Sequence, residues 1–178
     1  MIVSLTGYTG SGKSTAGMEL ARLLEWEFTD LDRYIEGKIG RSPEAIIAED
    51  GEVRFRAVEA EALRDVVIMH QLTGENLVLA LGGGTIMTTS VRNLILKDTV
   101  TVYLKTSEEE LRLRKSPDEG RWDPQRAPVY ELASLTVTTD GKTPQETAEA
   151  IRAKLIENKN SINEQQREHL ESSGSGRP

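Results

Sequence analysis

The chain of 178 residues contains no cysteine. This absence excludes a disulfide framework, a thiolate zinc site and a cysteine nucleophile. The apolar runs are also far too short to cross a bilayer, so we expect no membrane partner. No basic and apolar leader precedes the first strand-like run, which predicts a cytoplasmic protein.

Basic residues are in the minority, with 22 lysines and arginines against 29 aspartates and glutamates and a net charge of −7. A nucleic-acid surface needs a concentrated basic face, so this balance disfavours DNA or RNA as a partner. The length and the 37% share of hydrophobic residues suit one globular domain with a real core. We therefore expect a domain that acts on a small molecule.

Short apolar runs alternate with amphipathic stretches. The pattern predicts strands at 2–6, 76–81, 99–104 and 134–139, with a weaker fifth candidate at 27–30. Helices are predicted at 13–24, 31–39, within 51–71, and at 89–97, 107–115 and 144–157. Ser107 and Thr143 each offer an N-cap hydroxyl with a glutamate three residues later. Alternating strands and helices indicate an α/β fold with a mostly parallel sheet covered on both faces.

Two regions depart from this alternation. Residues 115–128 combine three prolines, a glycine and several charges, which predicts a surface loop. The tail at 158–178 is polar and ends in serine, glycine and proline. We expect the tail to be disordered, or to extend the last helix before fraying, and we assign it no function.

The most informative stretch is "GYTGSGKST" at 7–15. It satisfies the pattern G-x-x-x-x-G-K-[ST] and lies between a predicted strand and a predicted helix. Its glycines let backbone N–H groups turn toward phosphate oxygens, and the helix that follows adds the positive end of its dipole. Lys13 would lie between the β- and γ-phosphates, while the Ser14 hydroxyl would bind Mg²⁺. The stretch predicts a nucleoside triphosphate site made of Gly10, Ser11, Gly12, Lys13, Ser14 and Thr15.

Two carboxylates follow the weak second strand. Asp30 and Asp32, in "TDLDR", come at its carboxyl end, and open α/β sheets bind their ligands beyond those ends. One carboxylate could hold Mg²⁺ and the other could accept the proton of an attacking hydroxyl. A helix N-cap with a solvated partner explains the same spacing, so both interpretations stay open.

Two further patterns are ambiguous by themselves. Arg56 and Glu59 share a helical face, as either a surface ion pair or an arginine fork aimed at a substrate carboxylate. The second pattern is the triplet Gly82, Gly83 and Gly84 directly after the strand at 76–81. A simple turn needs only one or two glycines, so three favour a backbone that approaches a ligand closely.

The motifs "GYTGSGKST", "DLD", "FRAVE", "GGG" and "RAPVY", in this order, resemble those of the shikimate kinase family from residue 2 to about 157. The resemblance implies a three-layer α/β/α P-loop kinase fold with five parallel strands in the order 2-3-1-4-5. It implies one kinase domain at 1–157, with a substrate-binding helical region at 31–62 and a lid at 115–126. The implied reaction is transfer of the γ-phosphate of ATP to the 3-hydroxyl of shikimate, with Mg²⁺, by a monomer.

The resemblance also gives the acceptor residues their roles. Asp32 matches the aspartate that binds the shikimate hydroxyls and acts as base, and Asp30 matches the carboxylate on the Mg²⁺ side. Arg56 matches an arginine that binds the shikimate carboxylate, with Glu59 supporting it. Arg126, in "RAPVY", matches the second carboxylate-binding arginine. The triplet Gly82, Gly83 and Gly84 matches glycines that line the shikimate pocket.

Around the nucleotide, the resemblance is less complete. Arg114 and the turn "KTP" at 142–144, which contains Pro144, match segments that flank adenine, and Arg121 is the best match to the lid arginine. The implied catalytic set is then Lys13, Asp32 and Arg121, and the implied Mg²⁺ set is Ser14 and Asp30. Most of the family's lid sequence is missing here, because only "RWDPQ" separates this region from Arg126. A solvated loop charge is the alternative for Arg121.

The shortened lid keeps two alternative functions open. One is a related small-metabolite kinase with another hydroxylated acid such as gluconate, because Arg56 and Arg126 suit any carboxylate. The other is a weakly catalytic nucleotide-binding module that regulates or binds a partner protein.

Overall fold

A parallel sheet organises the structure, a computed structural model that describes the backbone of residues 1–114 and 123–174 and side chains as far as residue 160. Within these residues the sheet has five strands, β1 (Ile2–Thr6), β2 (Glu27–Asp30), β3 (Leu77–Ala80), β4 (Val100–Lys105) and β5 (Leu135–Thr138). Their order is β2-β3-β1-β4-β5, and every neighbouring pair is parallel. The predicted strand order is confirmed, and the weak candidate at 27–30 is the edge strand β2.

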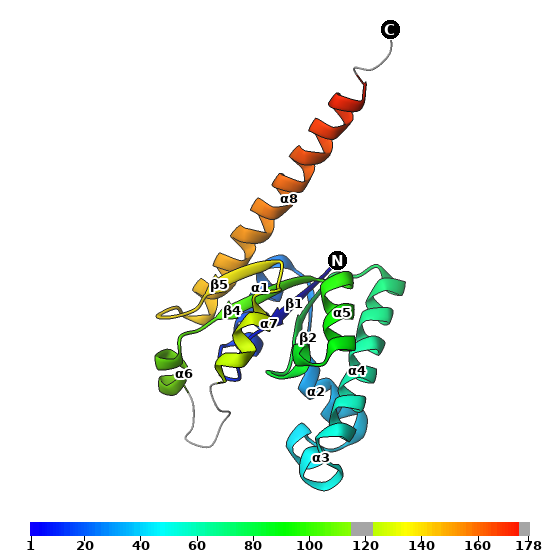
Figure 1. Ribbon diagram of the computed structural model, residues 1–178, viewed down its shortest axis with the longest axis vertical. Coiled ribbons are helices and arrows are strands. Elements are labelled where there is room, and N and C mark those ends of the chain that lie inside the picture. The colour runs from blue at the N-terminus through cyan, green and yellow to red at the C-terminus, as the bar shows by residue number, and fades with distance from the viewer. Residues whose placement is uncertain (115–122, 175–178) are drawn as a thin grey trace.

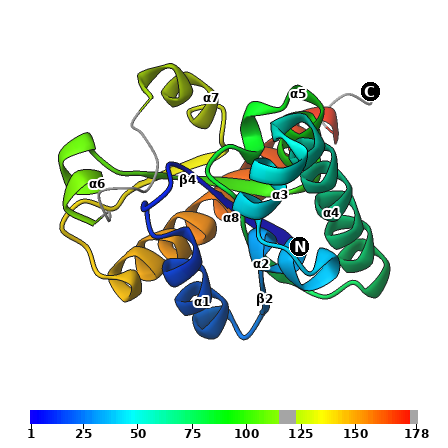
Figure 2. The same cartoon turned by 90° about the horizontal axis from the view of Figure 1, so that it is seen from below.

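Helices cover both faces of the sheet (Figures 1 and 2). They are α1 (Lys13–Leu24), α2 (Leu31–Ile39), α3 (Pro43–Asp50), α4 (Glu52–Thr73), α5 (Thr89–Asp98), α6 (Glu108–Arg114), α7 (Ala127–Tyr130) and α8 (Pro144–Gly174), with 3₁₀ turns η1 (Thr85–Met87) and η2 (Pro124–Arg126). Helices α1 and α8 pack against each other on one face. Helices α4 and α5 lie on the other, and α2 and α3 pack onto α4. The predicted three-layer α/β/α arrangement is confirmed.

The alternation of side chains along a strand explains why both faces are covered. In β1, Val3 and Leu5 face the layer of α1 and α8, whereas Ile2 belongs to the cluster of α4 and α5. In β3, Val78 faces the layer of α1 and α8, and Leu79 belongs to the cluster of α4 and α5. All of these side chains are buried. A strand buried on both sides reads as a continuous apolar run, which is why these segments were recognisable.

Local capping sets where several helices begin. Thr143 and Glu146 form a complete capping box, because the backbone N–H of each donates to the other's side chain, at 2.8 and 3.2 Å. The Ser107 hydroxyl accepts from the N–H of Glu110 at 3.2 Å. Helix α3, which the sequence analysis did not predict, begins in the same manner at Ser42, whose hydroxyl accepts from the N–H of Ala45.

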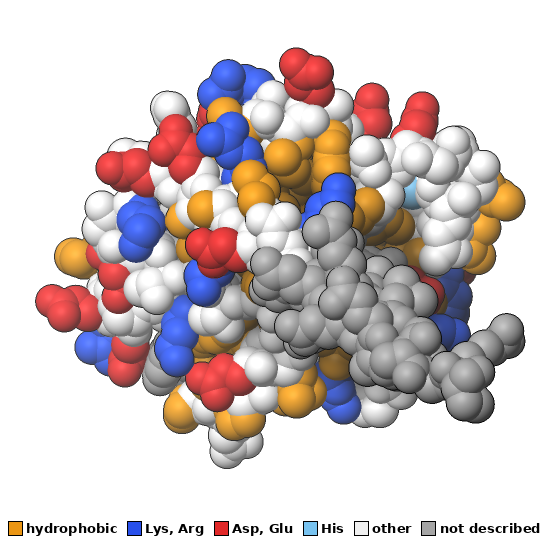
Figure 3. All heavy atoms as spheres, turned by 90° about the horizontal axis from the view of Figure 1, so that it is seen from above, with side chains coloured by type: hydrophobic (Ala, Val, Ile, Leu, Met, Phe, Trp, Pro, Cys, Tyr) orange, Lys and Arg blue, Asp and Glu red, His pale blue; other side chains and the backbone are white. Residues whose placement is uncertain are grey.

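Helix α8 continues through part of the polar tail. It runs to Gly174 and projects beyond the sheet as the long helix at the upper end of Figure 1. Figure 3 shows acidic and basic side chains interspersed over the face seen from above. In the part of the chain that the structure describes, the helices are too short or too polar to cross a membrane.

Candidate active site

A cavity of about 450 Å³ opens at the carboxyl ends of β1, β2 and β3. This is the edge at which open α/β sheets bind ligands. Its wall consists of the loop after β1, the two aspartates after β2, the glycines after β3 and residues near the start of α8. The lining residues are Thr9, Gly10, Ser11, Gly12, Lys13, Ser14, Thr15, Ala16, Asp30, Asp32, Leu81, Gly82, Gly83, Arg114, Lys142, Pro144 and Thr147.

The loop after β1 has the backbone that its glycines predict. Gly7, Gly10 and Gly12 have φ angles of 142°, 84° and 91°, a region that other L-residues rarely adopt. Gly12 is the N-cap of α1 and has no side chain to accept from the N–H groups of the first turn. The Lys13 amine folds back across the loop and donates to the carbonyls of Gly7 and Tyr8 at 2.9 and 2.8 Å. A positive charge and a helix N-terminus therefore meet at one wall of the cavity.

Asp30 is a helix N-cap, as one of the two interpretations of its spacing predicted, and it also contacts the phosphate loop. It caps α2, because its Oδ1 accepts from the N–H groups of Asp32 and Arg33 at 3.1 and 3.3 Å. Its Oδ2 accepts from the Ser14 hydroxyl at 2.5 Å. The cap fixes the carboxylate, and the second oxygen is thereby held beside the phosphate loop.

Asp32 lies in the same cavity and has an altered acidity. The pKa of its carboxyl is raised from 3.8 to about 6. Burial is the main cause, the Asp30 and Glu59 carboxylates add to it, and the Lys13 amine partly opposes it. A carboxyl group with such a pKa can accept and release a proton near neutral pH, as a general base must.

The glycine triplet allows three close approaches. A β-carbon added at Gly82 would lie 3.0 Å from Asp32 Oδ1, and one at Gly83 would lie 2.6 Å from Thr9 Oγ1. One at Gly84 would lie 2.6 Å from Arg56 Nη2. Close packing favours glycine at these three positions, none of which has a positive φ.

Arg56 and Glu59 form a pair that is mostly withdrawn from water. Arg56 Nη1 donates to Glu59 Oε2 at 2.8 Å, and Nη2 donates to Glu52 Oε1 at 3.1 Å. The Glu59 side chain is only 1% exposed, so the exposed surface ion pair is the weaker of the two interpretations. The Arg56 guanidinium lies against Gly84. Gly82 and Gly83 line the cavity, whereas Gly84 does not.

Arg126 lies in a segment that is held against the site by hydrogen bonds of two tyrosines. Its Nε lies 3.5 Å from Asp123 Oδ2. The Tyr8 hydroxyl donates to the Asp123 carbonyl at 2.6 Å, and the Tyr130 hydroxyl donates to the Gly83 carbonyl at 2.5 Å. Burial raises the pKa of the Tyr130 hydroxyl to about 12, with the Arg126 guanidinium opposing the shift, so this donor keeps its proton.

The tyrosines also pack against each other. The rings of Tyr8 and Tyr130 meet edge to face at 4.9 Å, and Tyr103 stacks on Tyr130 at 5.2 Å. None of the three tyrosines is among the predicted site residues, although Tyr8 and Tyr130 lie inside the motifs "GYTGSGKST" and "RAPVY". Arg126, like Arg56, lies outside the cavity lining among the described residues. Arg121 falls outside the described residues altogether.

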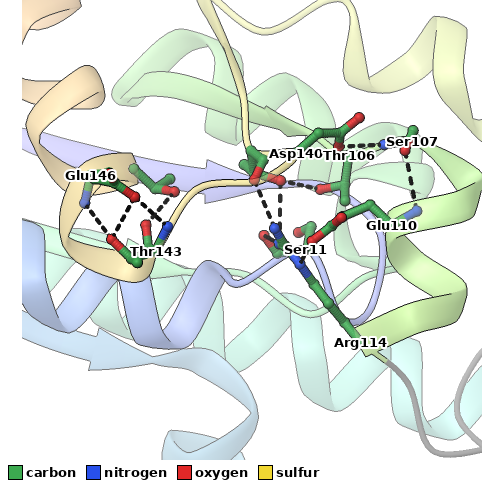
Figure 4. Close-up of polar contacts among 10 residues, drawn as sticks. Ser11, Thr106, Ser107, Glu110, Arg114, Asp140, Thr143 and Glu146 are labelled. Atoms are coloured by element: carbon green, nitrogen blue, oxygen red, sulfur yellow. Dashed lines mark hydrogen bonds and ion pairs between the residues drawn. The ribbon is translucent and has the colours of Figure 1, made fainter.

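Arg114 connects the phosphate loop to the segment before α8 (Figure 4). Its Nη2 donates to the Thr139 carbonyl at 2.7 Å, and Nη1 lies 3.5 Å from the Ser11 carbonyl. Glu110 accepts from Arg114 Nε at 2.7 Å and holds the guanidinium from the other side. Arg114 thus lines the cavity together with Lys142 and Pro144 of the predicted turn at 142–144, and with Thr147, which was not predicted.

A phosphate loop after the first strand of a 2-3-1-4-5 sheet, with a carboxyl of raised pKa in the same cavity, is the arrangement of the P-loop kinases. The comparisons with known proteins narrow this class. The family model for shikimate kinase matches residues 9–156, and the chain belongs to that family.

Two relatives show the extent of the likeness. A shikimate kinase of Thermus thermophilus is 39% identical over 168 residues, which cover 86% of this chain and 89% of the relative. The structure of a shikimate kinase from Acinetobacter baumannii in complex with shikimate superposes with a TM-score of 0.79 at 32% identity. It covers 89% of this chain and 94% of that one.

The likeness to a gluconate kinase is weaker. A gluconokinase from Sinorhizobium meliloti 1021 shares 18% identity and a TM-score of 0.50, with coverage of 90% of this chain and 95% of that one. Such a likeness shows the fold alone. The comparisons therefore favour the shikimate kinase family over the gluconate-type alternative.

Proposed function

We propose that this chain transfers the γ-phosphoryl group of MgATP to the 3-hydroxyl of shikimate. Family membership supports an ATP-dependent kinase, and the A. baumannii relative was solved in complex with shikimate. The observation that carries the proposal is that Asp32, with a pKa of about 6, lines the same cavity as Lys13. A phosphoryl donor and a hydroxyl acceptor need this combination of a cation and a proton acceptor in one crevice.

On the donor side, backbone N–H groups of the phosphate loop would bind the triphosphate. The Lys13 amine would exchange its two carbonyl acceptors for β- and γ-phosphate oxygens. Arg114 and Pro144 would flank the adenine base. Because Glu110 and Thr139 already hold the edge of the Arg114 guanidinium, its flat face remains suited to contact a base.

Ser14 and Asp30 fit a Mg²⁺ site. Both supply hard oxygen ligands, which Mg²⁺ prefers, and these oxygens are 2.5 Å apart. Among the described residues there is no cluster of three or more histidines, aspartates and glutamates that could hold a metal ion by itself. This suits an ion that the protein shares with the phosphates of its nucleotide. Bound there, Mg²⁺ would neutralise charge on the β- and γ-phosphates.

On the acceptor side, Asp32 would take the proton of the 3-hydroxyl. The acceptor oxygen then bonds to the γ-phosphorus while the bond between that phosphorus and the leaving ADP oxygen breaks. Arg56 and Arg126 would bind the substrate carboxylate, and the backbone of Gly82, Gly83 and Gly84 would line the acceptor pocket. Positioning and charge stabilisation supply most of the rate enhancement in such transfers.

Three further parts of the proposal rest on the sequence. Arg121 would supply the lid's positive charge to the transferring phosphoryl group. Residues 1–157 would form one kinase domain, and the tail at 158–178 would have no catalytic role. The protein would act as a cytoplasmic monomer without a nucleic-acid or membrane partner.

The test is ADP release by the purified protein, measured with ATP alone and with shikimate, gluconate or another hydroxylated acid added. We expect release that depends on shikimate and saturates with it. Faster ADP release with gluconate than with shikimate would mean that gluconate is the acceptor. ATP binding without turnover on any acid would instead support the regulatory module.

A further inference from the structure

A buried chain of polar groups, Thr85–Glu59–Arg56, connects the glycine triplet to helix α4. The Thr85 hydroxyl donates to Glu59 Oε1 at 2.6 Å, and Arg56 Nη1 donates to Glu59 Oε2 at 2.8 Å. Thr85 is fully buried and Glu59 is 1% exposed. Each oxygen of the carboxylate is thus held by a donor, and the two donors come from different elements, η1 and α4.

Burial makes the orientation of this carboxylate sensitive to both donors. A charged group away from water depends on its hydrogen bonds, and removing one of them costs far more than removing a bond at the surface. Without the Thr85 hydroxyl, Glu59 Oε1 would lose its donor and the carboxylate would be free to rotate. Arg56 would then lose the fixed partner that directs its guanidinium.

Thr85 also fixes the glycine triplet. Its backbone N–H donates to the Gly82 carbonyl at 3.2 Å, and a β-carbon added at Gly82 would lie 3.0 Å from Thr85 Oγ1. Gly84, the last glycine of the triplet, lies against the Arg56 guanidinium. The threonine therefore sets two things at once, the path of the loop and the direction of the arginine that borders it.

We propose that Thr85 is a positioning residue for the acceptor, which acts through Glu59 to aim Arg56 at the substrate carboxylate. This inference rests on the proposed function. Thr85 is not among the residues that line the cavity, so its effect must pass through Glu59 or the loop. Lys13 and Arg114, on the donor side, have separate partners.

The test measures the KM for shikimate and the KM for ATP in three variants of Thr85. Thr85→Val and Thr85→Ala, which lose the hydroxyl, should raise the KM for shikimate about tenfold or more. The KM for ATP should stay within about twofold of wild type, since only acceptor binding is changed. Thr85→Ser, which keeps the hydroxyl, should restore the KM for shikimate. Valine puts a methyl group in place of the hydroxyl, whereas alanine only removes atoms. The alanine variant therefore takes the place of the valine variant if the latter does not fold.

Thr101→Val is the matched control. Thr101 is also a fully buried threonine, but its hydroxyl contacts Ser4 and Thr99 inside the sheet. Its variant should leave both KM values unchanged. A Thr101 variant with the same rise in the KM for shikimate would mean that any loosened core weakens acceptor binding, which overturns the inference.

A double-mutant cycle tests whether Thr85 acts through Glu59. In a Glu59→Gln background, Thr85→Val should add little to the KM for shikimate, because the two residues act as one unit. Additive effects, unchanged KM values in the valine and alanine variants, or an equal rise in the KM for ATP would each overturn the inference. Wild-type protein without shikimate-dependent turnover would overturn the proposed function itself, and the inference with it.

Discussion

Replacing Asp32 by asparagine should stabilise the ligand-free protein at neutral pH while it removes the proposed base. Folding raises the pKa of the Asp32 carboxyl from 3.8 to about 6, chiefly through burial. A shift of about two units corresponds to about 3 kcal/mol that the ionised carboxylate costs the folded state. Asparagine has nearly the same shape and carries no charge, so it avoids this cost.

One effect works in the opposite direction. Asp32 lies in the first turn of α2, where a negative charge interacts favourably with the helix dipole by about 0.3–1 kcal/mol. The desolvation cost is larger, so a net gain of about 2 kcal/mol remains. For a protein of this size, such a gain raises Tm by about 4–8 °C.

The pH dependence of this stability gain shows whether the ionised Asp32 carboxylate is its cause. Because the pKa is higher in the folded than in the unfolded state, the wild-type protein gains stability from this group below about pH 4 and loses it as the pH rises through about 6. The advantage of Asp32→Asn should therefore be small near pH 4 and complete above pH 7.

Thermal unfolding of both proteins between pH 4 and pH 8 provides the measurement. Asp98→Asn makes the same chemical change at the end of α5 and serves as the control. An asparagine variant that is no more stable at pH 8, or equally stabilised at pH 4, would refute the argument that the buried carboxylate is costly.

Three other predictions concern activity. The kcat/KM for shikimate should rise with pH through about 6, as Asp32 loses its proton, and a profile that is flat from pH 5 to 8 would contradict a base of raised pKa. Gly84→Ala should displace the Arg56 guanidinium, whose Nη2 would lie 2.6 Å from the new β-carbon, and raise the KM for shikimate about tenfold; Tm should fall as well, because the buried Glu59 carboxylate loses its partner. Ser14→Ala should lower kcat at limiting Mg²⁺ more than at saturating Mg²⁺, and an equal loss at both concentrations would argue against a metal ligand.

The sequence predicted the parts of the fold that local patterns determine. Apolar runs marked the strands, and the glycines of 7–15 marked the phosphate loop, because close approach to phosphate needs positive φ angles that glycine readily adopts. Helix α3 was missed although its start, Ser42 followed by a proline, has the pattern of a helix N-terminus. The strand order came from the family resemblance, since periodicity does not specify which strands are neighbours.

The acceptor side was less predictable, because its contacts join distant segments. The raised pKa of Asp32 depends on burial and on Glu59, from another helix. The contact of Glu59 with Thr85 spans 26 positions of the chain, so helical spacing could show only the pairing of Glu59 with Arg56. For Asp30, the sequence offered a cap or a metal-side carboxylate as alternatives, whereas one oxygen caps α2 and the other accepts from Ser14.

Phosphorus NMR of the reaction mixture tests the central claim most directly. With ATP, Mg²⁺ and shikimate, a phosphomonoester of the 3-hydroxyl should accumulate in step with ADP, and the Asp32→Asn protein should still bind ATP but form little of it. ADP accompanied only by inorganic phosphate, or an ester that the asparagine variant forms at the wild-type rate, would contradict the account.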